Sequence, residues 1–162
     1  MKKLDLNQSI SIFANIGVIV GLIFLGYEIR QNTAQMRADA GYSINEAVDA
    51  LNSSIYQDKD FAALVLRAEQ SFNELERVDQ ARIASFYFSE LNLADYISKL
   101  ESEGMSDLHF DYVGFKVKQF WEMPGRREFV EQYVIPSEHF GSDELYLRLT
   151  LDPESEYAES KI

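Results

Sequence analysis

The sequence predicts a mainly α-helical protein, in which an N-terminal transmembrane helix continues into a small helical bundle and a short strand lies near the C-terminus. Three observations lead to this fold class. Residues 6–27 carry no charged side chain. Apolar residues then recur at three- and four-residue steps through most of the chain, which is helical spacing. Strict two-residue alternation over eight residues, which is typical of a strand, occurs at 144–151.

Length and composition indicate the number of domains and the kinds of partner that the protein can bind. A chain of 162 residues suits one domain, and 46% hydrophobic residues are enough to form a core. Asp and Glu number 27 against 15 Lys and Arg, which gives a net charge of −12. Such a surface repels phosphate backbones, so we expect no nucleic-acid partner. The absence of cysteine excludes thiol catalysis, disulfides and cysteine metal sites.

The first element follows a short tail at 1–8 and is a predicted transmembrane helix at 9–27. As a helix, the uncharged run spans about 33 Å, and the hydrocarbon layer of a bilayer is about 30 Å thick. Tyr27 lies where an interfacial aromatic residue is expected, with Arg30 just beyond it. The run holds eleven strongly apolar residues, namely Ile10, Ile12, Phe13, Ile16, Val18, Ile19, Val20, Leu22, Ile23, Phe24 and Leu25.

Three other interpretations of this run are a cleaved signal peptide, a buried helix of a soluble protein and an amphipathic surface helix. No small-x-small cleavage site follows Leu25, and no charged face is present, so a membrane span is favoured. We therefore expect a single-pass protein of the inner (plasma) membrane, with the lipid bilayer as one partner. Lys2 and Lys3 before the span balance Arg30 and Arg37 after it, so the side that the soluble domain faces is left open.

Small residues share one face of this helix. Ala14, Gly17 and Gly21 recur at helical spacing, and Gly17 and Gly21 form a G-x-x-x-G pair. Such a face lets a second helix approach closely in lipid, which points to a homo-oligomer or to another membrane protein as partner. The alternative is that glycine is simply frequent in membrane helices.

A helical soluble domain is predicted for 28–151. The first helix continues without proline to about residue 54, either as a stalk or as the first helix of this domain. Asp58 is a plausible N-cap for a second helix at 59–72. A third helix is predicted at 76–103, with Gly104 as its stop signal.

The C-terminal elements are less uniform in pattern. Residues 107–122 fit a helix, although part of the segment alternates like a strand. Pro124 suits the first turn of a further helix at 124–134. Residues 144–151 predict a strand, with a short amphipathic helix as the alternative. An acidic, flexible tail is expected at 152–162.

Glu90 is the polar residue most worth testing for function, because it falls on the apolar side of the third predicted helix. A carboxylate there must be paired, protonated or facing a cavity. One interpretation is a ligand pocket that Glu90 forms with Trp121 and Arg127. The other is a buried ion pair with an arginine such as Arg67.

Other candidate chemistry is sparse. The only histidines, His109 and His139, lack metal-site spacing, so we expect no metal and no cofactor. The segment MPGRREF could hold an anion at a helix start through Arg126 and Arg127, or its arginines could pair with acids. The aromatic residues Phe86, Tyr87, Phe88, Tyr96, Phe115, Phe120 and Trp121 could line a hydrophobic pocket or form ordinary core. The chain has no phosphate-binding glycine loop and no nucleophile elbow, which argues against an enzyme.

Three stretches resemble a widespread group of small, uncharacterised bacterial proteins. In LIFLGYEIRQNTAQMRA the match is carried by Tyr27, Ile29, Arg30, Gln31, Asn32 and Thr33, whereas Glu28 stands where an uncharged residue is common. In ESEGM and FWEMPGRREF it is carried by Gly104, Trp121, Pro124, Gly125 and Arg127. The resemblance implies a single-pass membrane protein with a small helical domain, and it implies no activity.

The predicted function is therefore that of a membrane-anchored helical protein, not an enzyme, which acts through protein–protein contacts and self-association. The alternative is a membrane-tethered ligand-binding or sensory module with a pocket around Glu90.

Overall fold

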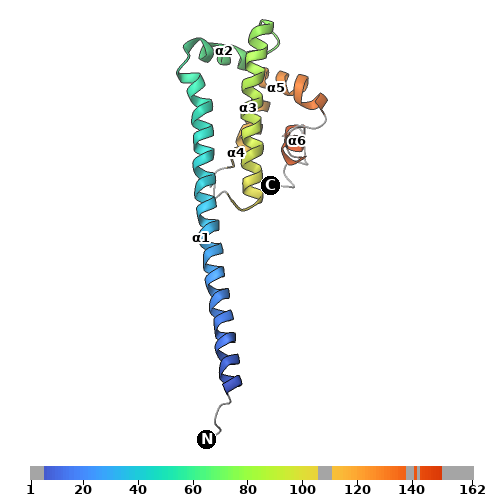
Figure 1. Ribbon diagram of the computed structural model, residues 1–162. Helices are drawn as coiled ribbons and strands as arrows, with labels where there is room; N and C mark the ends of the chain where they lie inside the picture. Colours follow the sequence, from blue (N-terminus) through green and yellow to red (C-terminus); the bar gives the residue numbers. More distant parts are fainter. Residues whose placement is uncertain (1–5, 106–110, 138–140, 142, 151–162) are drawn as a thin grey trace. The chain divides into compact units, whose positions relative to one another are not determined.

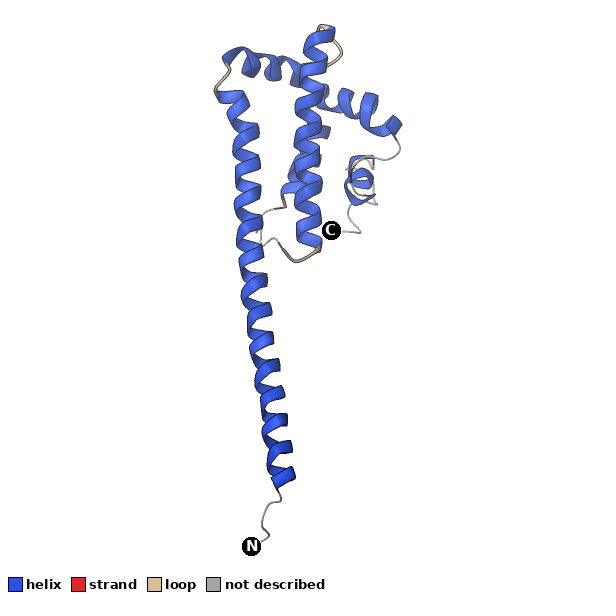
Figure 2. Cartoon of the chain, in the orientation of Figure 1, coloured by secondary structure: helices blue, strands red, loops and turns tan. Residues whose placement is uncertain are grey.

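The computed structural model describes residues 6–105, 111–137, 141 and 143–150. Within these residues every regular element is helical, which confirms the mainly α-helical class, and Figure 2 shows no strand. The chain divides into two compact units, Met1–Asp39 and Ala40–Ile162, and the division falls within the first helix. His109, His139 and the predicted tail at 152–162 lie outside the described residues.

Helix α1 runs from Leu6 to Tyr56, which confirms the long uninterrupted helix predicted from the apolar spacing (Figure 1). In the first unit, every side chain from Ile10 to Asn32 is exposed. Among the described residues, α1 is the one helix that is long and apolar enough to cross a membrane.

The second unit holds the end of α1 and all later elements. These are α2 (Lys59–Gln70), α3 (Arg77–Ser102), α4 (Tyr112–Glu122), α5 (Pro124–Phe129), the π-helical turn η1 (Val130–Val134), the 3-10 turn η2 (Ile135–Ser137) and α6 (Asp143–Thr150). The expected helices at 59–72, 76–103 and 124–134 are thus present, although the last becomes a π-helical turn after Phe129. The segment 107–122 is helical from Tyr112 onward, and 107–110 lie outside the described residues.

Local capping explains where several of these helices begin and end. The Asp58 side chain accepts hydrogen bonds from the amides of Asp60 and Phe61, both at 3.0 Å, so it caps α2 as predicted. Gly104 follows α3 with a φ of 66°, a conformation that glycine adopts without steric cost. These caps satisfy backbone groups that the helices leave free at their ends.

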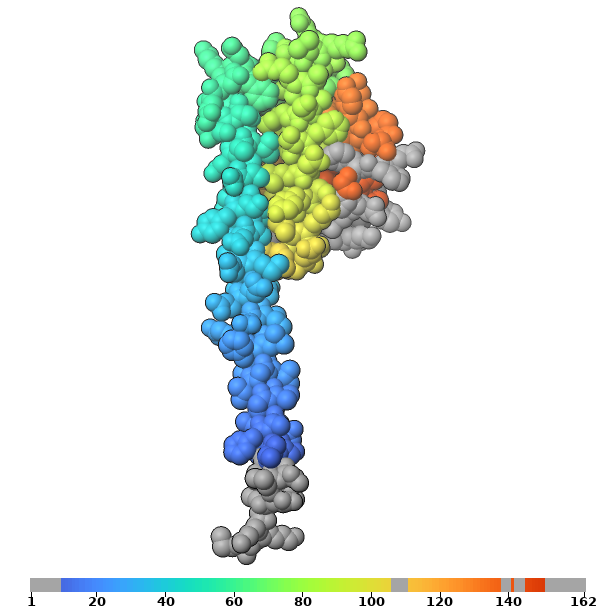
Figure 3. All heavy atoms as spheres, viewed as in Figure 1, coloured from blue at the N-terminus to red at the C-terminus, as the bar shows by residue number. Residues whose placement is uncertain are grey.

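Helix α3 lies at the centre of the core. Tyr87 and Leu91 are fully buried in a cluster that also takes apolar residues from α2, α4, α5 and α6. On another side, Leu93 and Ile97 of α3 pack with Ile44 of α1. Figure 3 shows residues 40–56 and α3 meeting along their length without a gap. The part of α1 beyond Ala40 is therefore the first helix of this bundle.

Helices α2 and α5 cross at Gly125. A Cβ built at Gly125 would lie 1.7 Å from the Ala68 carbonyl oxygen, so no other residue fits there without a shift of backbone. Pro124 begins α5, as predicted, because its missing N–H is not needed in the first turn. The Pro124–Gly125 pair therefore positions α5 tightly against α2.

The strand expected at 144–151 is wrong, because α6 is a helix. Leu145 and Leu149 are fully buried, whereas Leu147 between them is 50% exposed. Residues four apart share a helical face, so two of the alternating leucines meet the core and the third does not. A helix also satisfies its own backbone groups, whereas a lone strand would need a partner. The amphipathic helix that was the alternative interpretation is the one that forms.

Candidate functional site

The most concentrated group of charges in the described chain is a cluster, buried at Glu90 and Arg126, to which four helices each contribute one side chain. Arg126 of α5 donates from Nη1 to Glu90 of α3 at 2.6 Å, and from Nη2 to Glu69 of α2 at 3.1 Å. Lys116 of α4 donates from Nζ to the other oxygen of Glu90 at 2.5 Å. We call Glu69, Glu90, Lys116 and Arg126 the charge cluster. Its two cations and two anions balance.

Aromatic rings enclose the Arg126 guanidinium. Its central carbon lies 4.6 Å from the centre of the Tyr87 ring and 5.0 Å from that of Phe120. Both distances allow cation–π attraction. Arg126 is 4% exposed. Burial on its own lowers the pKa of Arg126, but the charges of Glu90 and Glu69 and the hydrogen bond to Glu90 outweigh burial and raise that pKa. Arg126 is therefore a permanent cation.

Two tyrosines beside the charge cluster are held in their neutral form. Burial, with the nearby charge of Glu90, raises the pKa of Tyr112 to about 12. Burial also raises the pKa of Tyr87 well above its usual value, against the opposing charge of Arg126. Neither phenol is thus suited to act as a proton acceptor near neutral pH.

The structure confirms that Glu90 is paired with an arginine, but the expected partner was wrong. Arg67 instead approaches Asp79 at 3.5 Å, and its side chain is 63% exposed. Arg126 takes the place expected for Arg67, because Gly125 brings the first turn of α5 against α2. The sequence signal for this partner was the Pro-Gly start of α5, which precedes Arg126 directly.

The two other residues expected at a pocket with Glu90 form a separate pair. The Arg127 Nε donates to the Trp121 carbonyl oxygen at 3.0 Å, and its guanidinium lies 5.9 Å from the indole centre. Arg127 is exposed. The interpretation of MPGRREF in which its arginines pair with acids therefore holds for Arg126, whereas Arg127 binds a backbone carbonyl.

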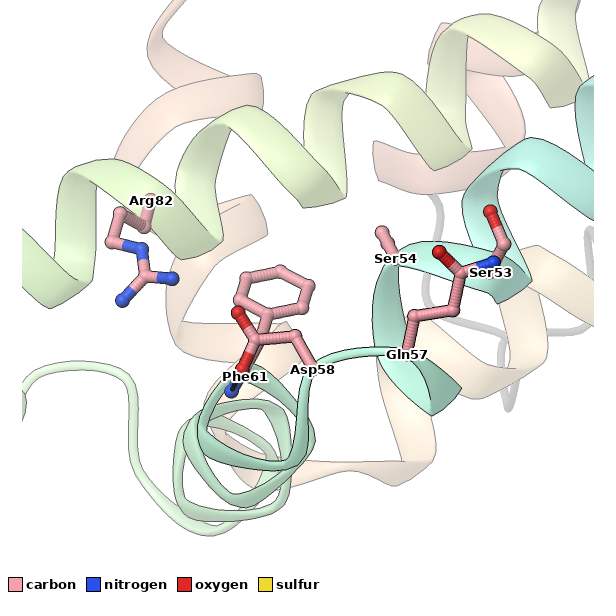
Figure 4. A pocket seen from close by; sticks show the side chains of 6 residues that line it. All are labelled: Ser53, Ser54, Gln57, Asp58, Phe61 and Arg82. Atoms are coloured by element: carbon pink, nitrogen blue, oxygen red, sulfur yellow. Dashed lines mark hydrogen bonds between the residues drawn. The ribbon is translucent and has the colours of Figure 1, made fainter.

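One shallow hollow of the second unit lies away from the charge cluster. It has a volume of about 420 Å³ and is lined by Ser53, Ser54, Gln57, Asp58, Phe61 and Arg82. Figure 4 shows the end of α1 on one side, Arg82 of α3 on the other and Phe61 of α2 between them. The Arg82 guanidinium stacks over Phe61 at 5.4 Å, and the Asp58 carboxylate caps α2. Asp58 is thus engaged in starting α2, and Arg82 joins α3 to α2 through Phe61.

The first unit offers a different kind of site, the face of α1 that carries Ala14, Gly17 and Gly21. A Cβ built at Gly17 or Gly21 would meet nothing within 4 Å. The face is therefore open to a second helix, and close packing through it stays a prediction. Further along the same unit, Glu28, Gln31, Asn32 and Gln35 are exposed on one side of α1.

Groups of metal-ligating side chains are absent from the part of the chain that the structure describes. Comparison with models of known protein families, with curated proteins and with solved structures gave no match. The resemblance carried by residues 27–33, by Gly104 and by residues 121–127 therefore stays a prediction.

Proposed function

We propose that this protein is a single-pass membrane protein whose helical domain acts through protein–protein contacts, including contacts with its own copies. The observation that carries the proposal is the exposed apolar part of α1. Each of the eleven large apolar side chains between Ile10 and Leu25 is at least 49% exposed.

Water is a poor solvent for this surface. Burying one large apolar side chain contributes about 1.5–3 kcal/mol, so eleven such side chains left in water carry a large penalty. A bilayer removes the penalty, and a helix is suited to it because each backbone group is satisfied within the segment. Insertion in the inner (plasma) membrane agrees with this chemistry, because helices are the spanning structures that carry apolar runs of this kind.

Protein contacts are favoured over catalysis by the state of the charged groups. Glu90 and Arg126, the most buried charges, have their hydrogen-bonding groups occupied by one another and by Lys116 and Glu69. A general acid or base must reach a substrate, whereas these groups hold four helices together. The ligand-binding alternative around Glu90 stays a prediction.

Self-association is proposed to use the face formed by Ala14, Gly17 and Gly21. Lipid tails are as apolar as leucine, so helices in a membrane associate through close packing rather than through hydrophobic burial. Two glycines four residues apart allow that close approach.

The first test is extraction of membranes with alkaline carbonate, followed by detection of the full-length chain. We expect the wild-type chain to stay in the pellet. Replacement of Ile19 and Leu22 by arginine should release it, because each charge at mid-span costs about 2.5–3.5 kcal/mol. Release of the intact wild-type chain into the supernatant contradicts the membrane anchor.

The second test measures energy transfer between labelled full-length copies in lipid vesicles. Gly17→Ile with Gly21→Ile should reduce the transfer strongly. Gly26→Ile is the matched control, because Gly26 is equally open but lies on another face of the helix. Equal loss in both variants contradicts the assigned face, and no transfer in the wild type contradicts self-association.

A further inference from the structure

We draw no further inference here: the strongest candidate, the exposed side of α1 on which the carboxamide of Asn15 interrupts the apolar run, carries nothing, because nothing in the structure shows what covers it.

Discussion

Replacement of Gly125 by alanine tests the contact on which the arrangement of α2, α5 and the charge cluster depends. The added Cβ would lie 1.7 Å from the Ala68 carbonyl oxygen, 2.8 Å from the Ala68 carbonyl carbon and 2.9 Å from the Phe72 nitrogen. All three atoms belong to backbone, so no rotation of a side chain relieves the clash. An ordinary contact begins at 3.4 Å, so the two helices must separate by about 1.7 Å.

The cost has two parts. Overpacking of a well-packed contact costs about 1–3 kcal/mol. A shift of α5 also moves Arg126, the next residue, which now lies 3.1 Å from Glu69 and 2.6 Å from Glu90. Weakening a buried, charge-assisted hydrogen bond adds about 1–3 kcal/mol. We therefore expect Gly125→Ala to lower the free energy of unfolding by about 3 kcal/mol or more.

The assay is urea unfolding of the full-length protein in detergent micelles, followed by circular dichroism. Gly41→Ala is the matched control, because it lies inside α1 with nothing within 4 Å of the new Cβ. Alanine is the better helix former, so the control should stabilise by about 0.5–1 kcal/mol. If Gly125→Ala unfolds within about 0.5 kcal/mol of the wild type, the close crossing of α2 and α5 is wrong.

Three further predictions follow from the bundle. Arg126→Met should lower the free energy of unfolding in urea by about 3–5 kcal/mol, because it leaves the Glu90 carboxylate buried with one partner fewer. Adding Glu90→Leu should recover part of that loss. If stability does not recover, the unpaired Glu90 charge is not the cause. Leu149→Asp should destabilise the protein by more than about 2 kcal/mol, whereas Leu147→Asp should stay within about 0.5 kcal/mol; equal effects contradict the helical face of α6. Burial raises the pKa of Tyr112 from 10.0 to about 12. Its phenol therefore favours folding below pH 10, and this contribution to stability is lost as the pH rises to about 12. Tyr112→Phe should make the free energy of unfolding fall less steeply between these two pH values, and an unchanged alkaline profile refutes the assignment.

Local pattern was enough for the helices whose signals lie within a few residues of one another. The apolar spacing predicts α1 and α3, and Asp58 predicts the start of α2, because capping and helical periodicity involve neighbours in the sequence. The apolar position of Glu90 similarly predicts that its carboxylate is buried, since the face of a helix that meets the core is set by spacing alone, whereas the choice between an ion pair and a ligand pocket stayed open until the structure showed Arg126 beside it.

Alternation misled at α6 for a physical reason. Leucines at every second position all lie on one face of a strand. In a helix only those four apart share a face, so the same pattern also fits a helix in part. The segment would form a strand only if a second strand lay beside it. In the described residues, Leu145 and Leu149 of helix α6 instead pack into a core made of helices. That partner is a property of the whole fold.

The sequence by itself determined the helical class, the apolar segment suited to a membrane and the burial of Glu90. Only the tertiary structure decided that Arg126, and not Arg67, pairs with Glu90, and that Trp121 and Arg127 form a separate pair. The reason is that hydrophobic spacing records which face of a helix is buried, but not which helix covers it. That choice depends on contacts between segments far apart in the chain, such as the crossing of Gly125 over Ala68.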